Sequence, residues 1–218
     1  MLQRQLETEV MDSPEEARDY DSMDHVAVNQ QFVADFLHRW DGESPILDVG
    51  TGTAQIPIEL CRKDPAPQVT GVDLSREMLK VGEANVDAAG LADRIKLEHV
   101  DAKGLPYPDE SFAAVMSNSI VHHIPEPKAA MAEMIRVCRH GGLLFLRDLL
   151  RPDAEEELRH LVNTYANGAN EHQRKLFSDS LRAALSLDEV KAIVEELGFN
   201  GARVKATSDR HWTWATKK

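Results

Sequence analysis

An apolar segment that runs directly into two closely spaced glycines constrains this chain more than any other feature. Residues 46–49 read Ile-Leu-Asp-Val, Gly50 and Gly52 follow, and a helical pattern begins a few residues later. Glycine permits backbone angles that a Cβ atom disfavours, and the first turn of a helix presents unpaired N–H groups. The order predicts a parallel strand, a tight turn and a helix that together bind an adenosine-like ligand.

The spacing of the glycines disfavours NAD. A dinucleotide fingerprint has the form G-x-G-x-x-G/A, and counting from Gly50 places Gln55 at the third small position. A nicotinamide reductase would also need a catalytic Tyr-x-x-x-Lys, which the sequence does not show.

Carboxylates recur at the ends of three predicted strands. Asp48 lies in the first strand, and a second strand over 68–74 carries Asp73 about 20 residues past the glycines, the spacing of a ribose-hydroxyl contact. A third strand, predicted over 95–102, carries Asp101. Ligands of doubly wound sheets bind outside the carboxyl ends of the strands, so the three acids are expected to line one crevice.

Each acid also has a structural alternative. A helix is predicted from Ser75, its N-cap, to Ala88, and Asp73 would then help to cap it. Taken singly, Asp48 and Asp101 fit a cap or a solvated loop position equally well.

The segment Asp48-Val-Gly-Thr-Gly-Thr-Ala54 resembles the acidic-x-G-x-G-x-G turn of class I, Rossmann-like methyltransferases that use S-adenosylmethionine (AdoMet). Ala54 takes the third small position and is expected to add one methyl group between helix and strand. The resemblance extends over 45–148, where a strand, a His pair, a helix, a glycine turn at 141–142 and a strand follow in the order of the small-molecule branch, called type 11. His140 stands where that family usually has Pro.

The resemblance implies AdoMet as the cofactor and S-adenosylhomocysteine as the product. In this family Asp73 would accept the ribose hydroxyls, and Asp101 would contact the adenine amino group. The cofactor-binding residues that it implies are Asp48, Gly50, Thr51, Gly52, Asp73, Leu74, Met78, Asp101, Ala102, Ser117 and Asn118.

Three residues are catalytic candidates. His122 and His123 follow the fourth strand, where the methyl group should point, and a His can accept a proton near neutral pH. Adjacent side chains are expected to face different ways, so only one of the two should act; the alternative for each is a loop His bonded to the backbone. No metal is expected, because no carboxylate or Cys accompanies the pair at a suitable spacing. Tyr20 belongs to a Tyr-Asp-x-Met element that resembles the lid of quinone-biosynthesis C-methyltransferases, with an ordinary packed Tyr as the alternative.

The whole pattern predicts an α/β fold: a doubly wound, Rossmann-like sheet of seven mostly parallel strands with one antiparallel strand, helices on both faces and a helical insertion after strand five. One methyltransferase domain is expected over 1–218. It would comprise an N-terminal helical lid region (1–44), an AdoMet-binding core (45–150), the helical insertion (151–186), and a closing helix and β-hairpin (187–218).

The regions outside the core should select the acceptor. In the insertion, polar and aromatic side chains are candidates for the acceptor wall: Tyr165, Asn167, Asn170, His172 and Phe177. Trp212 and Trp214 lie on one face of the last strand and are expected to be core residues, as are Cys61 and Cys138.

Composition limits the kinds of molecule that this chain is expected to bind. A formal net charge of −12 lacks the basic surface that a phosphate backbone attracts, so nucleic acid is an improbable partner. No apolar run is long enough to span a membrane, and residues 1–16 do not resemble a secretory signal, so we expect a cytoplasmic protein. The sequence leaves open whether it is a monomer or a homodimer. Strand four lacks the Asn-Pro-Pro-Tyr pattern of amino-methylating enzymes. The predicted function is methyl transfer from AdoMet to a small-molecule acceptor by in-line displacement; the alternatives are a non-catalytic AdoMet-binding subunit and a nucleoside- or tRNA-modifying methyltransferase.

Overall fold

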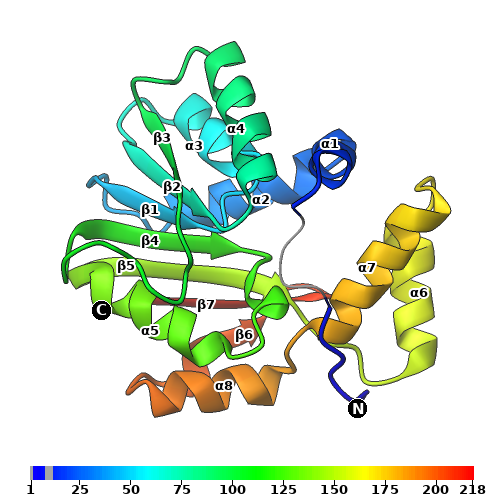
Figure 1. Cartoon of the computed structure of the whole chain (residues 1–218). Coiled ribbons are helices and arrows are strands. Elements are labelled where there is room, and N and C mark those ends of the chain that lie inside the picture. Colours follow the sequence, from blue (N-terminus) through cyan, green and yellow to red (C-terminus); the bar gives the residue numbers. More distant parts are fainter. Residues whose placement is uncertain (1, 8–11) are drawn as a thin grey trace. The chain divides into compact units, whose positions relative to one another are not determined.

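The computed structural model describes residues 2–7 and 12–218 (Figure 1). Seven strands of these residues form one sheet in the order β3-β2-β1-β4-β5-β7-β6. The strands are β1 (Ile46–Val49), β2 (Val69–Asp73), β3 (Ile95–His99), β4 (Phe112–Asn118), β5 (Cys138–Leu149), β6 (Val204–Ala206) and β7 (His211–Lys217). The α-helices are α1 (Pro14–Ser22), α2 (Val26–Leu37), α3 (Gln55–Lys63), α4 (Arg76–Ala88), α5 (Pro127–Val137), α6 (Glu155–Tyr165), α7 (Glu171–Ala183) and α8 (Leu187–Glu196).

Strand pairing confirms the predicted fold class. β1 lies between β2 and β4 and is parallel to both, and β2 is also parallel to β3. β6 and β7 pair antiparallel, with β7 the antiparallel strand of the sheet. This is the predicted Rossmann-like sheet, in which β1 is central and its carboxyl end leads into the glycine turn.

The chain divides into two compact units. The first, here called the glycine-turn unit, contains the described residues of 10–118, with Ala129–Leu146 and Ala215–Lys218. The second, here called the histidine unit, contains the described residues of 1–9, with Ser119–Lys128 and Arg147–Trp214. The single domain over 1–218 and its inner boundaries stay predictions, and residues 1 and 8–11 of the predicted lid region lie outside the described residues.

The core of the glycine-turn unit forms where α2 and α3 pack on the sheet. Phe32 and Phe36 of α2 are fully buried and meet Phe145 of β5 edge-on, with ring centroids 5.0 and 5.9 Å apart. α2, from Val26 to Leu37, lies in the region predicted to be helical, and its buried residues recur at helical spacing. Burial of these rings anchors the helices against the strands that carry the site.

The histidine unit contains the predicted helical insertion as two helices, α6 and α7. Leu158 and Leu161 of α6 pack with Leu181 of α7 in a separate apolar cluster. Trp212 and Trp214 are fully buried, as predicted. Among the described residues no helix combines the length and the apolar character needed to cross a membrane.

Two local predictions are wrong. β3 ends at His99, so Asp101 lies in the loop beyond the strand. No separate glycine turn precedes β5, which begins at Cys138, because the N–H of Gly141 donates to Lys218 O at 2.8 Å and the N–H of Lys218 donates to Gly142 O at 3.0 Å. The C-terminal residue thus pairs with the segment predicted to be a turn.

Candidate functional site

The turn after β1 adopts backbone angles that require its small residues. Gly50 and Gly52 have φ values of 76° and 54°, and the N–H groups of Gly50 and Thr51 both donate to Val72 O of β2. Ala54 also adopts a left-handed conformation, with φ 63°. Having Ala instead of a third Gly at this position therefore destabilises the backbone by roughly 1 to 2 kcal/mol. The Ala methyl group also occupies the volume expected from the sequence.

Asp73 ties this turn to the next helix. Its Oδ2 accepts a hydrogen bond from the Gly52 N–H at 2.8 Å, and its Oδ1 accepts one from the Ser75 N–H at 2.9 Å. Ser75 is the N-cap of α4, as predicted, because its Oγ accepts from the Met78 N–H. A carboxylate can accept about four hydrogen bonds, so Asp73 can support the backbone and still accept ribose hydroxyls.

Asp48 is a buried acid at the carboxyl end of β1. Only 2% of the residue is exposed, and its Oδ2 has no hydrogen-bond partner among the described residues. Burial, reinforced by the charge of Asp73, raises the pKa of Asp48 to about 7 against the opposing effect of the neighbouring Thr51 hydroxyl. That hydroxyl oxygen is also buried and makes no hydrogen bond of regular geometry within the described chain. Unpartnered buried acceptors beside an open glycine turn fit a polar, cationic ligand such as AdoMet.

Tyr20 of α1 lies over the glycine turn. Its Cε1 is 3.8 Å from the position that a Cβ atom on Gly52 would occupy, and its ring packs 4.9 Å from the His25 ring. Burial and the charges of Asp73 and Asp48 raise the pKa of Tyr20 to about 12. The phenol therefore stays neutral at ordinary pH, which suits a covering and hydrogen-bonding side chain and does not support a role as a base.

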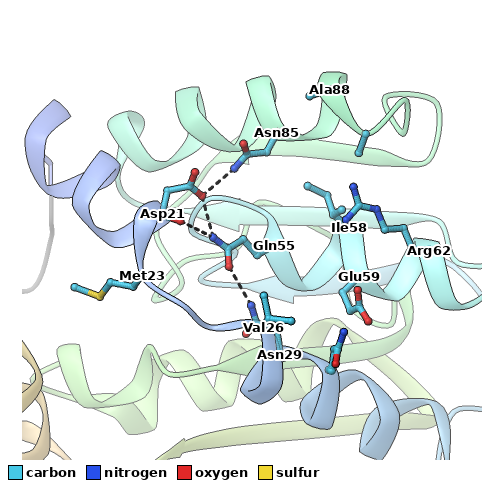
Figure 2. Close-up of a pocket in the computed structure, with 12 residues that line it drawn as sticks. Asp21, Met23, Val26, Asn29, Gln55, Ile58, Glu59, Arg62, Asn85 and Ala88 are labelled. Atoms are coloured by element: carbon cyan, nitrogen blue, oxygen red, sulfur yellow. Dashed lines mark hydrogen bonds between the residues drawn. The ribbon is translucent and has the colours of Figure 1, made fainter. Parts of the chain in front are cut away.

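A group of polar side chains fastens α1 to the helices beside the turn (Figure 2). Asp21 Oδ1 accepts hydrogen bonds from the side-chain amides of Gln55 and Asn85, at 3.0 and 2.9 Å. Gln55 Oε1 accepts from Asn29 of α2 at 3.1 Å. These four residues, here called the α1 latch, line a groove of about 400 Å³ to which none of the predicted site residues contributes. Gln55, which in the sequence only disfavours NAD, holds the segment that carries Tyr20.

Two further predicted residues lie at the end of β4. Ser117 donates through its hydroxyl to Val49 O of β1 at 2.9 Å, and β4 pairs with β1 at this position. Asn118 Oδ1 is buried and has no hydrogen-bond partner among the described residues. The structure thus brings Ser117 beside the last residue of β1 and leaves Asn118 with an open acceptor.

The remaining predicted cofactor-binding residues, among them the expected adenine contact Asp101, follow β2 and β3 or lie at the start of α4. Asp101 is about half exposed, accepts from the Lys103 N–H and pairs with the Lys103 ammonium at 3.2 Å. Ala102 follows it in the loop, Leu74 O is bonded to His99 Nε2, and Met78 is buried in the first turn of α4. Their contacts with a cofactor stay predictions.

The His pair lies in the histidine unit, in a short 3₁₀ turn over Val121–His123. His122 is buried, and its Nδ1 is 2.5 Å from Asp148 Oδ1. Burial disfavours the imidazolium, but the charge and hydrogen bond of Asp148 together with the charge of Glu7 outweigh burial and raise the pKa of His122. Asp148, at the end of β5, is a partner that the sequence analysis missed.

Two expectations about this pair are wrong. The adjacent side chains do not diverge: their ring centroids are 4.1 Å apart, and both rings approach Glu7 Oε1. A carboxylate does accompany the pair, because Glu7 reaches it from the N-terminal segment. No local sequence pattern could have indicated Glu7, which is far from the pair along the chain.

The predicted acceptor wall of the insertion stays a prediction, and several of its residues make structural contacts. The Tyr165 hydroxyl donates to Asp209 at 2.6 Å, with the Arg210 guanidinium 3.3 Å from the ring centroid. Asn170 caps α7, and Phe177 packs against the apolar cluster of α6 and α7. These contacts give three of the five candidates structural roles, while Asn167 and His172 are exposed.

Comparison with known proteins is consistent with this geometry. Residues 46–142 match the family model described as a methyltransferase domain. A demethylmenaquinone methyltransferase from Anoxybacillus flavithermus is 30% identical over 202 residues, which are 85% of this chain and 84% of that protein. The chain belongs to the class I methyltransferases. Members of this family depend on AdoMet, which identifies the ligand that the glycine turn fits.

Two further proteins resemble this chain over different lengths. A demethylmenaquinone methyltransferase from Porphyromonas gingivalis is 42% identical over 108 residues, which are 49% of this chain. The chain spans about half the length of several curated relatives, 44% in this case. A solved AdoMet-dependent methyltransferase from Aquifex aeolicus superposes with a TM-score of 0.69 at 18% identity, over 93% of this chain and 97% of that one, and supports the fold.

Proposed function

We propose that this chain transfers the methyl group of AdoMet to a small-molecule acceptor. The observation that carries the proposal is Asp48, a buried carboxylate whose Oδ2 has no partner among the described residues, beside a turn opened by Gly50 and Gly52. AdoMet, when bound, supplies a methyl group that its sulfonium has already activated. A cationic ligand next to Asp48 would compensate the charge of the buried carboxylate.

The residues of the glycine-turn unit then bind, orient and shield. Gly50 and Gly52 let the backbone approach the ligand, and Asp73 accepts the ribose hydroxyls while holding the turn through the Gly52 N–H. Tyr20 covers Gly52 and limits water. Holding reactants in line supplies most of the acceleration when the leaving group is already activated.

The acceptor is proposed from the relatives. Those named above are demethylmenaquinone methyltransferases, so a reduced quinone ring is the first acceptor to test. His122 and His123, which follow β4 in the chain, stay the predicted acceptor-side residues. The net charge of −12 disfavours a nucleic-acid acceptor.

The test is methyl transfer by the purified chain from AdoMet with a labelled methyl group. The acceptors would be reduced naphthoquinones, phenols and macrocyclic alcohols, with bulk tRNA as a comparison. The proposal predicts labelled product and stoichiometric S-adenosylhomocysteine with a small molecule, both lost in Asp48→Asn. AdoMet binding without turnover across the panel would favour the non-catalytic subunit, and labelling of tRNA alone would favour the nucleoside-modifying alternative.

A further inference from the structure

A carboxylate and two imidazoles converge in the histidine unit. Glu7 Oε1 is 3.0 Å from His123 Nδ1 and 3.5 Å from His122 Nε2, and the three potential donor atoms all lie within 4.8 Å of one another. The residues belong to one compact unit, so their arrangement does not depend on the other. We propose that Glu7, His122 and His123 bind a divalent transition-metal ion.

The separations of the donor atoms suit a common ion. Metal–ligand bonds to His nitrogen and carboxylate oxygen are about 2.0–2.2 Å for zinc, so neighbouring ligands of one ion lie roughly 3.0 Å apart at octahedral angles and about 3.4 Å apart at tetrahedral angles. The two distances from Glu7 Oε1, 3.0 and 3.5 Å, match these edges. The two imidazole nitrogens lie within 4.8 Å of each other, so the rings need only close to such an edge to complete the set.

Two of the donor atoms face each other directly. Glu7 Oε1 and His123 Nδ1 are buried and lie 3.0 Å apart, a pair whose geometry is not that of a regular hydrogen bond. Buried polar atoms that lack a well-formed hydrogen bond are rare and call for a specific explanation. An ion in place of a proton between them would bind both atoms at once.

Asp148 orients the third donor. Its Oδ1 lies 2.5 Å from His122 Nδ1, which places the ring proton on Nδ1 and leaves the lone pair of Nε2 toward Glu7. Asp148 is itself fixed, because its oxygens accept from the N–H groups of Val121 and Leu149. Metal-binding imidazoles usually donate their second N–H to such a carboxylate, which fixes the tautomer and strengthens the ligand.

The segment that carries Glu7 is held in place. The Arg4 guanidinium donates to the carbonyl oxygens of Ala183, His122 and Ile124 at 2.7–3.2 Å. Ser180 of α7 donates to Glu7 Oε2 at 3.3 Å. These contacts hold Glu7 beside the His pair. The three side chains keep a small exposed fraction, so an ion can reach them from solvent.

The ligand set selects the class of ion. Two imidazole nitrogens and one carboxylate oxygen suit zinc and its first-row neighbours, whereas magnesium and calcium prefer oxygen ligands. Three protein ligands also leave further positions open, as in sites where an ion binds a water or a substrate oxygen. With Nε2 bound to an ion, His122 would no longer be free to accept a proton from an acceptor.

The test is metal binding by the full chain after treatment with a chelator. Calorimetric titration with Zn²⁺ is expected to give one site per chain and Mg²⁺ none, and Co²⁺ is expected to produce the visible absorption of a nitrogen- and oxygen-ligated ion. Glu7→Gln and His123→Gln should each weaken Zn²⁺ binding by at least about tenfold, and Asp148→Asn by about 10- to 100-fold. None of these readouts requires methyl transfer, so failure of the proposed function would leave them intact.

His140 offers a matched control. Its Nε2 is 3.2 Å from Glu110 Oε1, but both side chains are exposed and no second imidazole accompanies them. His140→Gln should leave Zn²⁺ binding unchanged, and AdoMet affinity should be the same in Glu7→Gln as in the wild type. Zn²⁺ binding that survives both Glu7→Gln and His123→Gln, or no binding at all, would show that the cluster is only a set of ion pairs. If a variant fails to fold, the Zn²⁺ stoichiometry and Co²⁺ spectrum of the wild type decide.

Discussion

Replacing Asp48 by Asn is expected to stabilise the ligand-free protein at neutral and alkaline pH while weakening AdoMet binding. Asp48 is buried, and its pKa lies at about 7 in the folded chain against 3.8 for an ordinary Asp. The folded state therefore holds a proton that the unfolded state releases. Stability must then fall as the pH rises from about 4 to about 7, because ionising the buried group costs free energy.

The size of the effect follows from the two pKa values. Each pH unit between 3.8 and about 7 costs 1.36 kcal/mol, so the full penalty above pH 7 is about 4 kcal/mol. Asn imitates the protonated acid and avoids this cost. The difference in unfolding free energy between Asp48→Asn and the wild type should be near zero at pH 4, rise with pH and level off above pH 7.

Urea unfolding of both proteins at pH 4 to 8.5, followed by circular dichroism, measures this difference directly. Titrating groups distant from Asp48 affect both proteins equally and cancel in the subtraction, which leaves Asp48 and its coupling to Asp73 and Tyr20. A difference that does not change with pH would refute the raised pKa and the burial argument behind it. AdoMet titrations of the same proteins should show weaker binding in the variant, because the neutral amide loses the charge that attracts the cation.

Three other substitutions test separate parts of the cofactor site. Asp73→Ala should lower AdoMet affinity by about tenfold or more and also lower the melting temperature, because it removes charge-assisted hydrogen bonds worth roughly 1.5–3 kcal/mol each; unchanged affinity would reject the ribose role. Tyr20→Phe should bind AdoMet within about threefold of the wild type, whereas Tyr20→Ala should bind clearly more weakly, since the ring covers Gly52; equal affinities would remove Tyr20 from the site. Asp21→Ala, which breaks the hydrogen bonds from Gln55 and Asn85, should weaken AdoMet about 3- to 30-fold in the same titration without contacting it, and a silent variant would show that the α1 latch is not needed.

The sequence predicted the parts of this protein that depend on local pattern. The glycine turn, the Ser75 cap, the helical insertion and the closing hairpin follow from side-chain periodicity and capping residues, which act over a few positions. The end of β3 and the start of β5 were missed, because strand ends depend on pairing with distant segments such as the C-terminus. The fold class and the order of the helices and strands were therefore predictable, whereas the exact residues at which strands begin and end were not.

In the candidate sites, too, residues from neighbouring elements were predictable and residues from distant segments were not. Asp48, Gly50, Gly52 and Asp73 are brought together by consecutive elements, so their grouping was accessible to sequence reasoning. Glu7 reaches the His pair only through the folding of the N-terminal segment onto the histidine unit. Spacing along the chain carries no information about such contacts.

The most direct test of the central claim is calorimetric titration of the purified chain with AdoMet and S-adenosylhomocysteine, with NAD and NADP as controls. Both adenosyl compounds are expected to bind with micromolar affinity, weakened in Asp73→Ala, and the nicotinamide cofactors are expected not to bind. Binding of NAD or NADP instead, or of none of the four, would contradict the assignment of the glycine turn.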